Sequence, residues 1–131
     1  NGAKVESVCQ WAANKSFVER KYTVTHHDNS TVSGMQLIGF NPQAGNIQSW
    51  SFNSDGGHAV GIWKPVRGGW QEEVKGMTGS GVGTSSVNLL TPIDDNSYSL
   101  QSVRRTAVNT NWPDTDEVII RRQTQPQQSN E

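Results

Sequence analysis

The chain has 131 residues, of which 32% are hydrophobic and 18% charged, and its formal net charge is -1. A charge this close to zero disfavours a nucleic-acid binder that works by electrostatic attraction. The longest apolar stretch is only a few residues, which excludes a transmembrane helix, and the single Cys9 excludes an intramolecular disulfide. The length fits one domain with a small supply of apolar side chains.

The composition favours strands over helices. Valine and isoleucine number 13 and 6, whereas leucine and alanine number only 4 and 6. Branched side chains at Cβ are accommodated better in strands than in helices. The 13 glycines and 5 prolines lie in evenly spaced clusters, which is typical of turns between short strands.

These clusters divide the chain into strand-length segments. Turn signals lie at 27–31, 41–46, 53–57, 65–69, 79–83, 92–97 and 109–114. The predicted strands, in chain order, are 4–12, 16–26, 32–40, 47–53, 58–64, 70–78, 84–91, 98–108 and 116–123. Short connections favour antiparallel neighbours, so we expect an all-β, up-and-down meander of about nine strands, as a curved sheet or a lipocalin-like barrel. The domain spans residues 1–123, and residues 124–131 form a polar tail expected to be disordered.

Alternation within the strands is imperfect. In segment 16–26, Val18, Tyr22 and Val24 share one face with Arg20. In segment 47–53, Trp50 and the next aromatic fall opposite the serines. Such mixed faces predict a polar, water-filled or ligand-filled interior, a concave sheet that packs on a partner, or a bulge that exchanges the faces, and the sequence leaves these open.

The segment from Val32 to Trp63 carries a pattern of glycines, serines and aromatics. It resembles a β-rich domain that follows the SnoaL-like domain in SgcJ/EcaC-type bacterial proteins. The matched positions are Ser33, Gly34, Gln36, Ile38, Gly39, Pro42, Ile47, Ser49, Trp50, Phe52, Ser54, Gly56, Gly57, Gly61 and Trp63. The resemblance implies a single β-domain with a lipocalin-like barrel, and it supplies no activity. It also implies a SnoaL-like domain as a partner and leaves export or a periplasmic location open beside the cytoplasm.

Few groups offer catalytic or metal chemistry. Asp55 and His58 flank two glycines and form the best candidate acid–base pair, although a glycine-rich hairpin turn in which the aspartate caps backbone amides explains them better. His26, His27 and Asp28 are adjacent, and neighbours on a strand point to opposite faces, so we predict no metal site there. No cofactor motif is present.

The aromatic residues and two arginines are the candidates for binding. Rings supply contact area in an amphipathic pocket, while Gln36, Asn88 or an arginine orients the ligand. The predicted ligand-binding residues are Trp50, Trp63, Trp70, Tyr98, Arg104 and Arg105. By alternation, the two adjacent arginines point to opposite faces.

Three functions remain open from the sequence. The first is a noncatalytic domain that binds a small amphipathic ligand in an aromatic and arginine-lined concavity. The second is an interaction domain that pairs with itself or with a SnoaL-like domain. The third is an enzyme that uses Asp55 and His58.

Overall fold

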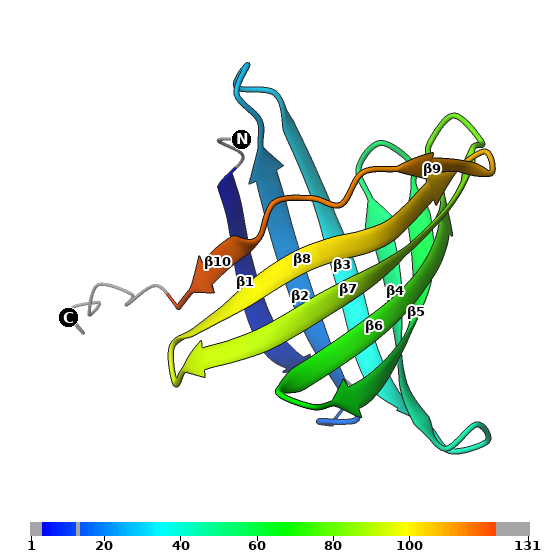
Figure 1. Cartoon of the computed structure of the whole chain (residues 1–131). Coiled ribbons are helices and arrows are strands. Elements are labelled where there is room, and N and C mark those ends of the chain that lie inside the picture. Colours follow the sequence, from blue (N-terminus) through cyan, green and yellow to red (C-terminus); the bar gives the residue numbers. More distant parts are fainter. Residues whose placement is uncertain (1–3, 13, 123–131) are drawn as a thin grey trace.

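Each strand from β1 to β8 pairs antiparallel with its neighbours in the chain, which produces one continuous meander (Figure 1). The computed structural model describes residues 4–12 and 14–122. Its ten strands are β1 (Lys4–Ala12), β2 (Phe17–Thr25), β3 (Thr31–Asn41), β4 (Asn46–Asn53), β5 (His58–Val66), β6 (Gly69–Met77), β7 (Gly83–Asp94), β8 (Ser97–Ala107), β9 (Thr110–Trp112) and β10 (Val118–Arg121). Both β9 and β10 pair with β8.

The predicted fold class is confirmed as a curled sheet. The strands wrap around a common axis, as Figure 1 shows, with β1 at one end of the sheet order and β10 at the other. The short strand β9 was not predicted, and β10 begins at Val118, two residues later than expected. The predicted polar tail, 124–131, lies outside the described residues.

The sheet has an inner face and an outer face, which cross-strand pairing defines. Directly paired residues point to the same side of a sheet, and successive residues alternate. Gln36, Ser49 and Glu72 are 6%, 1% and 6% exposed, so they mark the inner face. Their neighbours Leu37, Trp50 and Glu73 therefore belong to the outer face.

Apolar burial is low on both faces. Within residues 4–12 and 14–122, no hydrophobic side chain is fully buried, and the four buried polar residues are Gln36, Ser49, Glu72 and Ser99. The strand ladders and half-buried side chains therefore carry most of the stabilisation. The expectation of a partly polar interior agrees with this arrangement.

A bulge interrupts the pairing of β7 with β8. Ser85 pairs with Thr106, and Val87 pairs with Val103. Two residues of β8, Arg104 and Arg105, therefore lie opposite the single residue Ser86 of β7. Arg104 has a φ of 49°, in the left-handed region. Such a bulge changes the alternation beyond it, which decides where these arginines point.

Outer-face packing includes one aromatic cluster near the start of β2. Phe17 lies opposite Gly39 on β3, and a Cβ at that glycine would overlap the Phe17 ring. The same ring contacts Trp50 edge-on, with 6.3 Å between the ring centroids. A glycine at position 39 thus lets the ring lie against the backbone.

Candidate functional site

A chain of hydrogen-bonded polar side chains crosses the inner face from β2 to β8. We call it the inner-face polar network, and it consists of Arg20, Gln36, Ser49, Glu72, Asn88 and Ser102. The strand pairing assigns every member to the inner face. Each one either pairs with a buried inner residue or lies an even number of positions from one on the same strand.

Glu72 lies at the centre of this network. Its Oε2 accepts hydrogen bonds from Ser49 Oγ at 2.8 Å and from Gln36 Nε2 at 3.3 Å. Its Oε1 accepts from Asn88 Nδ2 at 3.0 Å. Because a buried carboxylate is costly unless it is hydrogen-bonded, these three neutral donors account for its place inside the sheet.

The network continues from Glu72 in both directions. Ser102 Oγ donates to Asn88 Oδ1 on the β8 side. Trp63 Nε1 donates to Ser49 Oγ at 3.0 Å, which joins an inner-face ring to the network. Several strands are thereby linked by side chains as well as by their backbone ladders.

Arg20 forms the β2 end of the network. Its Nη1 donates to Gln36 Oε1 at 3.5 Å, and its guanidinium carbon lies 5.4 Å from the centroid of the Tyr22 ring. The buried Nε has no hydrogen-bond partner among the described residues. The Tyr22 hydroxyl donates to Asn53 Oδ1, and burial raises the pKa of this phenol above its ordinary value of 10.0, against an opposing effect of Arg20.

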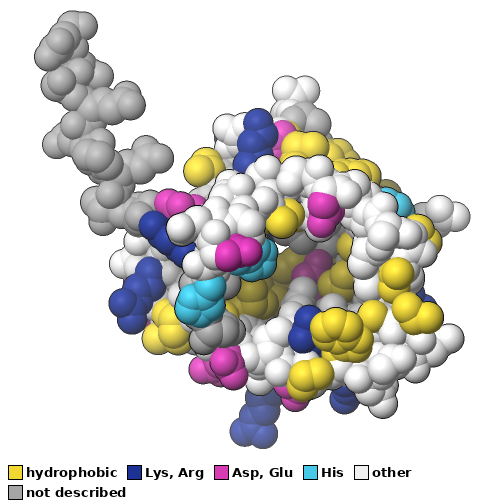
Figure 2. All heavy atoms as spheres, turned by 90° about the horizontal axis from the view of Figure 1, so that it is seen from above, with side chains coloured by type: hydrophobic (Ala, Val, Ile, Leu, Met, Phe, Trp, Pro, Cys, Tyr) yellow, Lys and Arg dark blue, Asp and Glu magenta, His cyan; other side chains and the backbone are white. Residues whose placement is uncertain are grey.

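An apolar zone lies beside the network on the same face. Its residues lie next to the network, on the side toward the end of the sheet that holds the β3–β4, β5–β6 and β7–β8 turns. Direct cross-strand pairs form three groups on neighbouring strands, which are Val18 with Ile38, Ile47 with Trp63, and Trp70 with Leu90, Leu100 and Val118. Seen from the opposite end, the molecule is hollowed, with hydrophobic and acidic side chains visible inside (Figure 2).

The predicted aromatic residues divide between the two faces. Trp63 and Trp70 lie in the apolar zone, and Tyr98, opposite Ile120 on β10, faces the same side. Trp50 pairs with Leu37 and Val60 and lies on the outer face, against Phe17. It therefore does not line the hollow with the other three.

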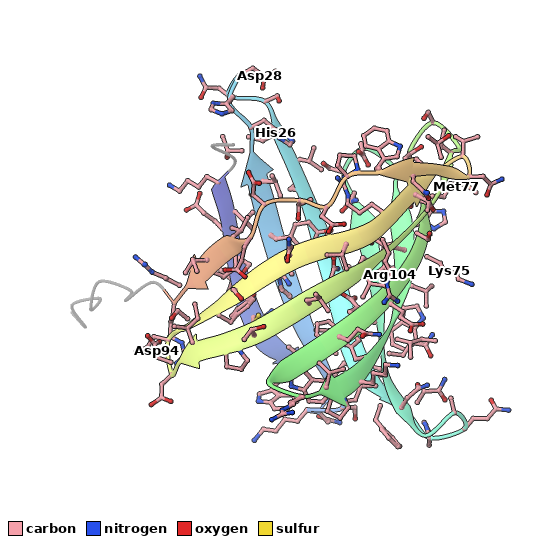
Figure 3. The ribbon with its side chains drawn as sticks, in the orientation of Figure 1. His26, Asp28, Lys75, Met77, Asp94 and Arg104 are labelled. Carbon is pink, nitrogen blue, oxygen red and sulfur yellow. The ribbon has the colours of Figure 1, made fainter. Side chains whose placement is uncertain are left out.

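The predicted arginines do not join the network. Arg104 is exposed, and Figure 3 shows it on the outside of the strands. Arg105 Nη1 donates to the Pro113 carbonyl at 3.1 Å, and its guanidinium lies 5.7 Å from the Trp112 ring. Beyond the bulge, Ala107 pairs with Thr84 on the inner face, so alternation places Arg105 on the inner side near the end of β8. The arginine that joins the network is Arg20, which the sequence shows as a charge on an otherwise apolar face.

Asp55 and His58, the acid–base candidates, lie in the β4–β5 turn and at the start of β5. Asp55 Oδ1 accepts from the Gly57 backbone N–H at 2.9 Å in the β4–β5 turn, and His58 pairs with Phe52 on the outer face. No hydrogen bond or ion pair joins these two side chains among the residues described.

The histidine and aspartate cluster of segment 26–28 lies at a turn. Asp28 Oδ1 accepts from Ser30 Oγ at 2.5 Å and from Ser30 N at 2.9 Å, and these bonds lower the pKa of the carboxyl. Asp28 stands at the tip of the β2–β3 connection, and His26 lies below it, directly after the end of β2 (Figure 3). Across the part of the chain that the structure describes, no three His, Cys, Asp or Glu side chains are grouped as metal ligands, and no helix has the length and hydropathy to cross a membrane.

A second hollow, of about 820 Å³, runs across β1 to β4 on the outer face. Its lining includes Ser7, Tyr22, Gly34 and Asn53, which pair with one another across the four strands and belong to the inner face by alternation. The outward side chains along it are Glu6, Val8, Lys21, Thr23, Ser33, Met35, Phe52 and Ser54. This outer groove is an open surface feature, separate from the inner-face polar network.

Comparison with known proteins gives no match: no family model, no curated protein and no solved structure is similar to this chain.

Proposed function

We propose that the inner face binds a small amphipathic ligand, without catalysis. The observation that carries this proposal is the side-by-side placement of the apolar zone and the inner-face polar network in one hollow. Binding sites for small molecules combine apolar walls with a few fixed polar groups. The apolar part of the ligand would contact Trp63, Trp70 and Leu90, and its polar end would meet the network.

Tryptophan indole N–H signals in NMR spectra provide a test with an internal control. Titration with n-alkanols and n-alkanoates of increasing chain length should shift the indole signals of Trp63 and Trp70. The signal of Trp50, on the outer face, should stay in place. If no alkanol or alkanoate shifts the Trp63 or Trp70 signal at millimolar concentration, the proposal is overturned. A shift of the Trp50 signal alone overturns it as well.

A matched pair of variants locates the site further. Leu89 and Leu90 are adjacent on β7 and point to opposite faces, since Leu89 pairs with Gln71 and Leu90 with Trp70. Leu90→Gln places an amide in the apolar zone and should weaken binding about tenfold, whereas Leu89→Gln should leave it unchanged. Equal weakening by both variants, at equal stability, would count against an inner-face site.

A second candidate function, self-association, is favoured by the outer face. Phe52, Val60 and Ile62 are 52%, 42% and 46% exposed on adjacent strands, next to the outer groove. Charges of both signs, such as Glu73 and Lys75, lie on this face, and the net charge of -1 gives copies little mutual repulsion. A second copy of the chain is the occupant we propose.

Light scattering coupled to size exclusion tests self-association. A dimer that dissociates in Phe52→Ser but not in Thr23→Ser supports it, while a monomer at all concentrations overturns it. The resemblance to domains that accompany a SnoaL-like domain names the alternative occupant, which a pull-down with such a domain would reveal.

A further inference from the structure

The inner-face polar network contains one acidic side chain, Glu72, and one cationic side chain, Arg20. Glu72 has hydrogen-bond partners for both of its oxygens, whereas Arg20 has few partners for its N–H groups. Glu72 receives three hydrogen bonds, from Ser49, Gln36 and Asn88. Its two oxygens are thus engaged by neutral donors that come from three other strands. A ligand gains little by offering Glu72 a further donor.

Arg20 is in the opposite position. Its single side-chain hydrogen bond in the described structure is the 3.5 Å contact to Gln36, at the outer limit of such bonds. The two ion pairs of the described chain, Lys4 with Glu6 and Lys21 with Glu19, both lie elsewhere. Gln36 stands between Arg20 and Glu72, so no carboxylate touches the guanidinium.

The position of this cation is nevertheless held. Arg20 pairs directly with Gln36 across β2 and β3, and its guanidinium lies over the Tyr22 ring. The Tyr22 hydroxyl is itself bound to Asn53 on β4, which keeps the ring in place. A guanidinium that is half-buried, positioned and short of acceptors favours a planar oxyanion, because two parallel N–H donors match two carboxylate oxygens.

We infer that the polar end of the bound ligand is a carboxylate, held by the guanidinium of Arg20. The inference rests on the proposed ligand-binding function and specifies the ligand's charge. The carboxylate lies at the network, and the hydrocarbon part extends along the inner face to the apolar zone of Trp63 and Leu90. Arg20 also disfavours a cationic head group by repulsion.

The test compares three ligands with the same hydrocarbon chain: decanoate, 1-decanol and decylamine. In calorimetric titrations at a pH where decanoate is ionised, the wild-type chain should bind decanoate at least tenfold more tightly than decanol and should bind decylamine most weakly. Arg20→Gln should bring decanoate down to the affinity of decanol without changing decanol, and Arg20→Lys should retain part of the preference. Arg104→Gln, which removes an exposed arginine on the outside, should change nothing.

Salt dependence supplies a measurement that needs no variant. The affinity of the wild-type chain for decanoate should fall as ionic strength rises, while that for decanol should not. Equal affinities for decanoate and decanol, or equal losses of both in a folded Arg20→Gln variant, overturn the carboxylate assignment and leave the proposed function standing. Failure of all three ligands to bind the wild-type chain overturns the proposed function itself.

Discussion

Ser49 on β4 and Glu72 on β6 are joined by a 2.8 Å hydrogen bond, although β5 lies between their strands. Gly61, the β5 residue paired with Ser49, makes this contact sterically allowed, because a Cβ there would overlap the Glu72 carboxylate. Because Gly61 has no side chain, the Ser49–Glu72 hydrogen bond can cross the inner face of β5.

Gly61→Ala should therefore destabilise the chain. The added methyl group displaces the Glu72 carboxylate and the Ser49 hydroxyl, and overpacking of this kind typically costs roughly 1–3 kcal/mol. Urea unfolding followed by tryptophan fluorescence measures the loss. Gly83→Ala is the matched control, since a Cβ at that strand position meets nothing within 4 Å. Equal unfolding midpoints for the two variants would contradict the steric role of Gly61.

Glu72→Gln should lower the free energy of unfolding while leaving the side-chain size almost unchanged. Three donors converge on the carboxylate, and an amide NH₂ would face at least one of them, leaving buried donors unsatisfied at a cost of about 1–3 kcal/mol. Chemical denaturation is the measurement. Glu73→Gln, at the next and exposed position, should change stability by less than about 0.5 kcal/mol. A Glu72→Gln variant as stable as this control would show that the network adds no stability.

The Tyr22 phenol predicts a loss of stability in alkali. Burial raises its pKa above the ordinary 10.0, so between that value and the folded pKa the unfolded chain releases its proton first. The stabilisation is present below pH 10, the ordinary pKa, and is lost as the pH rises through the folded pKa. Thermal melts across this range should show a steeper decline for wild type than for Tyr22→Phe. Parallel declines would contradict the shift.

Asp94 predicts the reverse dependence, in acid. The backbone N–H of Asn96, at 2.8 Å, and the Ser97 hydroxyl, at 2.9 Å, donate to its Oδ1 and lower the pKa of the carboxyl below 3.8. The stabilisation exists above pH 3.8 and disappears as the pH falls through the folded pKa. Asp94 is the last residue of β7 and stands beside the exposed β7–β8 turn (Figure 3). Asp94→Asn should flatten the acid limb of the stability profile, whereas the neighbouring Asp95→Asn should not.

The strand layout was predictable because turn residues are local signals. Clusters of glycine, proline, aspartate and asparagine separate most of the long strands, though not β1 from β2, and the predicted segments agree with β1 to β8 to within a few residues. The brief pairing of β9 with β8 was missed, since a strand of three exposed residues leaves no alternation to detect.

The faces were harder to predict than the strands. Apolar size suggested that Trp50 lines the concavity, yet the curled sheet turns Ser49 inward and leaves Trp50 outside. The inner face of a strongly curled sheet has less room, which favours small residues such as Ser49 and Gly61 where strands approach. Glu72 shares alternation with Trp70 and Val74, and this was the available sign that an acid lies inside.

Because each strand from β1 to β7 forms its backbone ladder only with its neighbours in the chain, loss of an end strand leaves the remaining ladder intact. The hydrogen bonds among Gln36, Ser49, Glu72 and Asn88 instead span β3 to β7 and tie these strands into one cooperative unit. Backbone amides of β1 and β10 should therefore exchange with solvent deuterium through local fraying, while those of β4 to β6 exchange only when the whole sheet opens.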